Sequence, residues 1–181
     1  NRQGYENLCY MVSEAFLHGF YGKPRIDLEL LRQRHDGLIA LSACLAGAIP
    51  QALMNESYAS AKAYALQMAD IMGEGNFYLE LQNHGIPEQL AVNQGIGRLA
   101  RETGLPLVVT NDAHYLRKED AKMQDVLLCI QTGKTVDDEN RMRFSSDDFY
   151  LKSEEEMRAL FPGCEEAFDN TVKIAQQCNL D

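Results

Sequence analysis

Three short apolar runs, separated by helical stretches and each followed by polar residues, constrain the fold of this chain more than any other feature. They are Gly37–Cys44, Phe77–Gln82 and Leu107–Thr110. Short runs rich in branched and aromatic side chains are typical of buried strands. Because a helix fits between each pair, the order strand, helix, strand, helix, strand predicts the α/β class, with parallel strands and outer helices.

The stretches between these runs carry helix start and stop signals. Ser57 or Ser60 begins a helix that Gly73 ends, and Glu88–Thr103 forms the next helix, which Gly104 closes. Three parallel strands leave sheet edges that need cover. We therefore expect either a small sheet or further strands in a segment that precedes this chain.

Two helices are also predicted before the first strand. Asp27 is the expected cap of a short helix. The longer helix, over Tyr5–Phe20, is expected to bury the face formed by Leu8, Val12, Ala15 and Phe16.

The pattern changes after Leu116. Lys118–Gln131 predicts a helix, Ser153 and Glu156 form a capping box that opens another, and Glu165–Gln177 predicts the last. We therefore divide the chain into residues 1–120, which carry the strands, and a helical C-terminal segment, residues 121–181.

Composition narrows the functional classes. A length of 181 residues is typical of one domain. A net charge of −10 argues against this chain as the main DNA-binding surface. An acidic nuclease site stays possible when metal ions meet the phosphate. No apolar run is long enough for a membrane span. The five cysteines form no CxxC pair, which favours a reducing, cytoplasmic setting.

The residues that follow the three apolar runs are the candidate site. Cys44 ends the first run, His84 follows the second, and Asp112 and His114 follow the third. The carboxyl ends of parallel strands meet at one edge of a sheet, so these side chains are expected to lie along one rim.

The strongest candidate ligands are Asp112 and His114, because side chains two residues apart on an extended segment point the same way. A carboxylate and an imidazole can share zinc, manganese or iron. The alternative is a capping Asp beside an exposed His, at even odds on the motif alone. Cys44 is either a core residue or a thiolate ligand. His84 is a secondary candidate, as a ligand, a phosphate contact or a His satisfied by backbone.

Five strings, in this order and over essentially the whole chain, resemble the PHP domain of bacterial DNA polymerase III alpha subunits. They are Lys23–Asp27, Gly37–Gly47, Leu105–Tyr115, Asp125–Lys134 and Glu166–Thr171. The resemblance implies a partial PHP-type (β/α)7 barrel with a metal site at the carboxyl ends of its strands. It also implies that residues 121–181 lead toward a polymerase palm outside the chain.

The resemblance also implies a ligand set. The late ligands of the family are a Cys or His after a mid-barrel strand and a closing Asp-x-His, which correspond here to Cys44, Asp112 and His114. The early His-x-His is not found in this sequence. The opening part of the barrel is therefore expected to lie outside the chain. Its exposed sheet edge leaves dimerisation, strand swapping or an open half-barrel as alternatives.

What the resemblance implies for function is a piece of a DNA-directed DNA polymerase, a nucleotidyltransferase that uses magnesium. Its PHP domain would act as a zinc- or manganese-dependent 3′–5′ exonuclease, with DNA and other replicase subunits as partners. The isolated piece is expected to be inactive and could form a homodimer. The alternatives are a non-catalytic scaffold for the polymerase or a proofreading partner, and a small-molecule phosphoesterase.

Overall fold

The computed structural model describes residues 1–180 and has a three-stranded parallel sheet in the order β1-β2-β3. The elements, in chain order, are α1 (Arg2–Leu17), α2 (Leu28–Arg34), β1 (Ala40–Leu41), α3 (Ala48–Asn55), α4 (Tyr58–Met72), β2 (Phe77–Leu81), α5 (Pro87–Thr103), β3 (Leu107–Val109), a short 3₁₀ turn (Lys118–Asp120), α6 (Ala121–Thr132), α7 (Glu154–Leu160) and α8 (Glu165–Gln177). The α/β class and the parallel strands are confirmed. A closed barrel is not among the features of the described residues.

The strand β2 is the centre of the sheet. It pairs in parallel with β1, where Ala40 faces Phe77, and with β3, where Leu79 faces Leu107. All five of its residues are buried, as expected of a strand covered on both faces. Leu79 lies in a core shared with side chains of α3, α4, α5 and α8. Each strand is shorter than the apolar run that predicted it.

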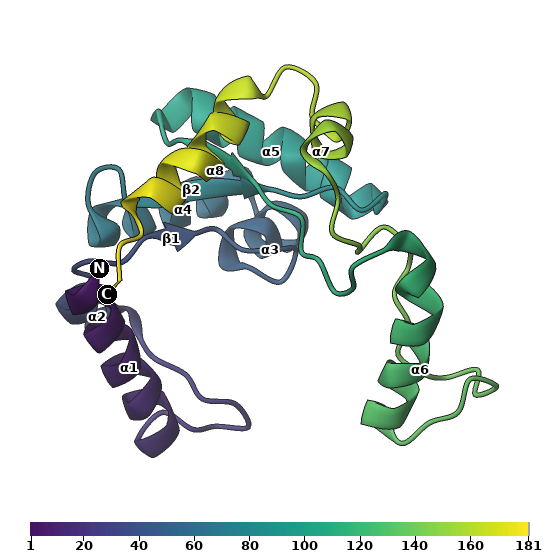
Figure 1. Ribbon diagram of the computed structural model, residues 1–181. Coiled ribbons are helices and arrows are strands. Elements are labelled where there is room, and N and C mark those ends of the chain that lie inside the picture. Colours follow the sequence, from purple (N-terminus) through teal and green to yellow (C-terminus); the bar gives the residue numbers. More distant parts are fainter. Residues whose placement is uncertain (181) are drawn as a thin grey trace.

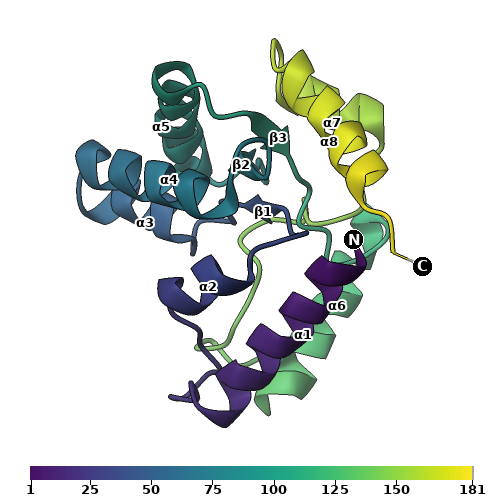
Figure 2. The same cartoon turned by 90° about the vertical axis from the view of Figure 1, so that its left-hand side faces the viewer.

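The molecule has the outline of an arch. Figure 1 shows α1 and α2 at one end, α6 at the other, and the sheet with its helices between them. Figure 2 shows α3, α4 and α5 on one side of the strands and α8 beside β3. None of the helices within residues 1–180 is long and apolar enough to cross a lipid bilayer.

Several helix ends follow the predicted capping chemistry. Asp27 accepts a hydrogen bond from the backbone N–H of Leu30, and Ser57, not Ser60, caps α4. Ser153 and Glu156 form the predicted capping box of α7. Gly104 closes α5 in the left-handed conformation, at φ 74°.

The buried face of α1 was predicted correctly only at Ala15. The helix buries Gly4, Asn7, Met11 and Ala15, while Leu8, Val12 and Phe16 are exposed. The reason is a close approach that only glycine allows, because a Cβ on Gly4 would lie 2.0 Å from the carbonyl oxygen of Gly37. Asn7 Nδ2 also donates to the carbonyl of Asp36 at 3.0 Å. Backbone contact, and not apolar periodicity, decides which face of α1 turns inward.

The outer edge of β3 is covered by α8. The backbone N–H of Leu79 donates to Pro106, and that of Thr110 donates to Leu81, so the carbonyl of Leu107 points away from β2. Asn170 Nδ2, on α8, donates to this carbonyl at 2.8 Å. Asn170 is only 3% exposed, so its amide shields the edge carbonyl within a packed interface.

An ion-pair cluster joins α4 to α5. The Glu102 carboxylate accepts from Lys62 Nζ at 2.8 Å and from Arg98 Nε at 2.7 Å. These hydrogen bonds lower the pKa of Glu102 from 4.5 to about 2, and the hydrogen bond from Lys62 has the largest effect. The carboxylate is therefore favoured in the folded state, and its contribution to stability is present above pH 4.5 and lost as the pH falls toward 2.

We expect Asn170→Ala to destabilise the fold by about 1–3 kcal/mol, because it leaves the edge carbonyl of Leu107 without its donor. Urea unfolding followed by circular dichroism measures this. Asn179→Ala is the matched control, since Asn179 is exposed and bonds only to carbonyls of its own turn. Equal stability of the two variants would contradict the edge-capping role.

We expect Glu102→Gln to flatten the acid dependence of stability. The free energy of unfolding of the wild type should fall between pH 4.5 and pH 2, and that of the variant should fall less over the same window. Urea unfolding at several pH values measures the slopes. The double variant Lys62→Met, Arg98→Met should flatten the curve in the same way. Parallel curves for the wild type and both variants would show that the ion pairs do not contribute to the acid dependence of stability.

Candidate functional site

The carboxyl ends of the three strands lie at one edge of the sheet, as the parallel pairing requires. Ser42 follows β1, Gln82 follows β2 and Thr110 follows β3. A buried polar row joins them just below this edge. Ser42 Oγ accepts from the Glu80 backbone N–H at 2.8 Å, Gln82 Nε2 donates to Thr110 Oγ1 at 3.0 Å, and the Thr110 hydroxyl donates to the Glu80 carboxylate.

Asp112 and His114 lie next to one another on the loop that follows β3. The distance from Asp112 Oδ1 to His114 Nε2 is 3.3 Å, and both side chains are about 40% exposed. The proximity does not come from the extended segment that the sequence predicted. Asp112 has a left-handed backbone, with φ of 50°, and this turn brings its carboxylate to the imidazole.

Cys44 is half-buried and follows a second left-handed residue, Ala43, whose φ is 66°. It lines a small pocket with Glu80, Gln82 and Gln89. Within residues 1–180, no group of three or more His, Cys, Asp or Glu side chains is placed to hold a metal ion. The structure thus brings Asp112 and His114 together and does not add Cys44 to them.

His84 is buried, and both of its ring nitrogens have protein partners. Gln89 Oε1 accepts from the His84 backbone N–H at 2.8 Å, so the Gln89 amide nitrogen faces the ring and donates to Nδ1 at 2.9 Å. Nδ1 is therefore an acceptor, and Nε2 carries the proton that it donates to the Asn111 carbonyl at 2.5 Å. In this arrangement the ring has no nitrogen free for a metal or a phosphate.

A segment that the sequence did not connect with the site, residues 144–151, completes the rim. The backbone N–H of His114 donates to the Phe149 carbonyl at 2.7 Å, and Tyr115 pairs with Tyr150 as in a parallel strand. The His114 ring lies 4.7 Å from the ring of Phe144 and 5.7 Å from that of Phe149. The one sequence signal that could have drawn attention to this segment is the short apolar run Phe149–Leu151 between polar residues.

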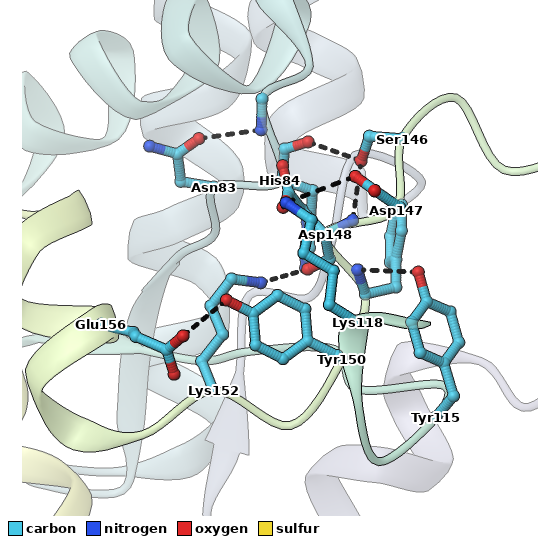
Figure 3. A network of polar contacts seen from close by, with 12 residues as sticks. Asn83, His84, Tyr115, Lys118, Ser146, Asp147, Asp148, Tyr150, Lys152 and Glu156 are labelled. Carbon is cyan, nitrogen blue, oxygen red and sulfur yellow. Dashed lines mark hydrogen bonds and ion pairs between the residues drawn. The ribbon is translucent and has the colours of Figure 1, made fainter. Parts of the chain in front are cut away.

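The same segment carries a polar network, shown in Figure 3. Lys118 Nζ lies 2.9 Å from Asp148 Oδ1, and this partner raises the pKa of Lys118. Burial lowers the pKa of Lys152, whose ammonium lies 4.5 Å from the centre of the Tyr150 ring. Tyr150 in turn donates to Glu156 at 2.7 Å. The network fixes the segment on the rim at several points.

A cavity of about 860 Å³ lies between α5 and the loop that joins α7 to α8, and it reaches the carboxyl end of β2 at Leu81 and Asn83. Its walls include Leu90, Leu107, Phe161 and one cation, Arg101. Cys44, His84, Asp112 and His114 do not line it. We place the candidate site on the rim, where the donor atoms are, and not in this larger cavity.

Comparisons with known proteins place the chain among bacterial polymerase sequences. Residues 1–84 match the family model described as PHP domain. The chain is 51% identical to DNA polymerase III subunit alpha of Thermus aquaticus, with 98% of the chain and 15% of that protein covered. The corresponding subunit of Treponema pallidum is 47% identical, with 99% and 15% covered. The chain thus spans about 15% of the length of these curated relatives.

We expect the His84 ring to be the tautomer with its proton on Nε2, because the Gln89 amide nitrogen donates to Nδ1. Two-bond ¹H–¹⁵N correlation spectra of the ring measure this, with a His84→Asn variant to assign the signals. Gln89→Leu removes the donor to Nδ1 and should shift the Nδ1 resonance. A spectrum with the proton on Nδ1 would contradict the assigned network.

Proposed function

We propose that the rim of this chain is part of a divalent-metal phosphoesterase site within a DNA polymerase III alpha subunit. The premise is that residues 1–84 match the PHP domain family model and that nearly the whole chain matches one segment of such subunits. Asp112 and His114 are the proposed ligands. The proposed activity is 3′–5′ hydrolysis of a DNA strand, and that of the whole subunit is template-directed DNA synthesis with magnesium.

The spacing of Asp112 and His114 carries the proposal. Two ligands on a tetrahedral zinc ion with bonds of about 2.0–2.1 Å lie about 3.3 Å apart. The 3.3 Å between Oδ1 and Nε2 therefore suits two donors of one ion. Carboxylate oxygen and imidazole nitrogen are also donors that zinc and manganese accept. The partial exposure of both side chains leaves them accessible to an ion and to a substrate.

The backbone at the proposed ligands supports a functional reading. Ala43 and Asp112 are two residues other than glycine that adopt a left-handed conformation, and each lies beside or at a proposed ligand. Such conformations are costly and cluster at functional sites. Cys44 is proposed as a further thiolate ligand, in an arrangement of the Ala43–Cys44 turn that joins the pair.

In this proposal the bound metal ion would supply the positive charge that meets the DNA phosphate. A bound divalent metal activates water and stabilises charge on a phosphodiester. Asp112 and His114 would hold that ion at the rim of a chain whose net charge is −10. Any further ligands would come from other parts of the subunit, because Asp112 and His114 alone are fewer than the three protein ligands of a catalytic zinc site.

The same similarity supports proposals about the fold, the partners and the compartment of the whole subunit. The sheet would be part of a PHP-type (β/α)7 barrel, with residues 1–120 as its C-terminal portion and residues 121–181 leading toward the polymerase palm. DNA and other replicase subunits would be partners, and the cytoplasm the compartment. By itself the chain would hydrolyse DNA poorly and could form a homodimer through an uncovered sheet edge.

A second function, a non-catalytic scaffold, is favoured by one observation. The described residues hold no three-ligand group, while α8 packs on the sheet through Ala167 and Phe168. In this case the rim would brace the polymerase or a proofreading partner. Loss of the metal ligands would then leave hydrolysis unchanged.

The two functions are separated by substitution in the full-length subunit. We expect Asp112→Asn and His114→Ala each to lower manganese- or zinc-dependent 3′–5′ hydrolysis of a mispaired primer by about tenfold or more, while DNA synthesis is retained. Gel analysis of a labelled primer measures both activities. His35→Ala is the control for a histidine away from the rim, and wild-type hydrolysis in both rim variants would leave the scaffold as the function.

A further inference from the structure

The His114 ring is held by aromatic contacts that no capping or pairing rule requires. Phe149 is only 6% exposed, and its ring lies 5.7 Å from that of His114 at an interplanar angle of 75°. Phe144 lies 4.7 Å from His114 and 4.5 Å from Phe149. The three rings therefore form one contact cluster, and the orientation of His114 depends on the other two.

His84 is the other support of this cluster. Its ring stacks on Phe149, with 4.2 Å between ring centres and an interplanar angle of 5°. The ring itself is fixed by the hydrogen bonds from Gln89 to Nδ1 and from Nε2 to the Asn111 carbonyl. His84 therefore contacts the site in two ways. Its hydrogen bond to the Asn111 carbonyl holds the backbone just before Asp112, and its stacking holds Phe149, which contacts His114.

Backbone contacts join the same residues. The His114 N–H donates to the Phe149 carbonyl at 2.7 Å, and Asn111 Nδ2 donates to the Tyr150 carbonyl at 2.8 Å. The loop with both proposed ligands is therefore pinned on each side to the segment that carries Phe149. A side chain held at backbone and ring has little freedom to turn its donor atom away.

We propose that Phe149 and His84 are positioning residues for the Asp112–His114 pair: Phe149 fixes the His114 ring, and His84 supports Phe149 and the Asn111 carbonyl. This inference rests on the proposed function, in which the pair binds a divalent cation. It gives His84 the role of a support and not that of a ligand. It also makes residues well beyond the matched segment 1–84 part of the same site.

Ring order in the metal-free protein tests the positioning directly. The chain contains four histidines, so ¹³C relaxation of the Cε1 positions can be measured with histidine labelling. We expect Phe149→Leu to raise the mobility of the His114 ring to that of the exposed His18 ring, and Phe149→Tyr, which keeps an aromatic ring, to restore order. Phe161→Leu is the matched control, because Phe161 is equally buried at 6% and lies in another part of the core. An ordered His114 ring in Phe149→Leu would overturn the proposal.

Manganese alone then probes the consequence for the pair. Paramagnetic broadening of the His114 ring signal is followed as Mn²⁺ is added to the wild type and to each variant. We expect Phe149→Leu and His84→Leu to need about tenfold to 100-fold more Mn²⁺ for the same broadening, and Phe161→Leu to match the wild type. Equal Mn²⁺ requirements in wild type and Phe149→Leu would overturn the positioning role.

Asp112→Asn separates this inference from the function on which it rests. If Asp112→Asn leaves the Mn²⁺ broadening of His114 unchanged, the pair is not a metal site and the proposed function fails. The ring-order comparison is made without metal, so its outcome does not depend on that result. Loss of broadening in Asp112→Asn, with an ordered His114 ring in Phe149→Leu, would refute the positioning role alone.

Discussion

Parallel pairing of β2 on both of its sides determines where the other parts of the molecule can lie. Because β1 and β3 run in the same direction as β2, their carboxyl ends meet at one edge and their connecting helices must return outside the sheet. Full burial of β2 places a polar row, with Glu80 at its centre, under that edge. The candidate ligands lie on the loops above this row.

The local elements could be predicted from the sequence because their signals are local. The capping box at Ser153 and the left-handed glycine after α5 depend only on neighbouring residues. The buried face of α1 could not be predicted in this way. It depends on a backbone contact with Gly37, more than thirty residues away, and periodicity alone favoured a neighbouring, more apolar face that shares only Ala15.

The candidate site likewise has a part that the sequence predicts and a part that only the tertiary structure shows. Parallel strand ends predicted that Cys44, His84, Asp112 and His114 share a rim, and the structure adds which of them touch. The left-handed backbone of Asp112 and the stacking of Phe149 on His84 are tertiary features that no spacing rule contains. Metal binding by the pair is a proposal that its spacing supports.

The cover on β3 has a consequence for how a larger assembly could be built. The edge is shielded by a side-chain amide from α8 and not by hydrogen bonds from another strand. The same helix contributes Ala167 and Phe168 to the core, so the edge cannot be exposed without opening that core. While α8 is in place, no further strand can pair with β3 on this side, and the sheet can be extended only beyond β1.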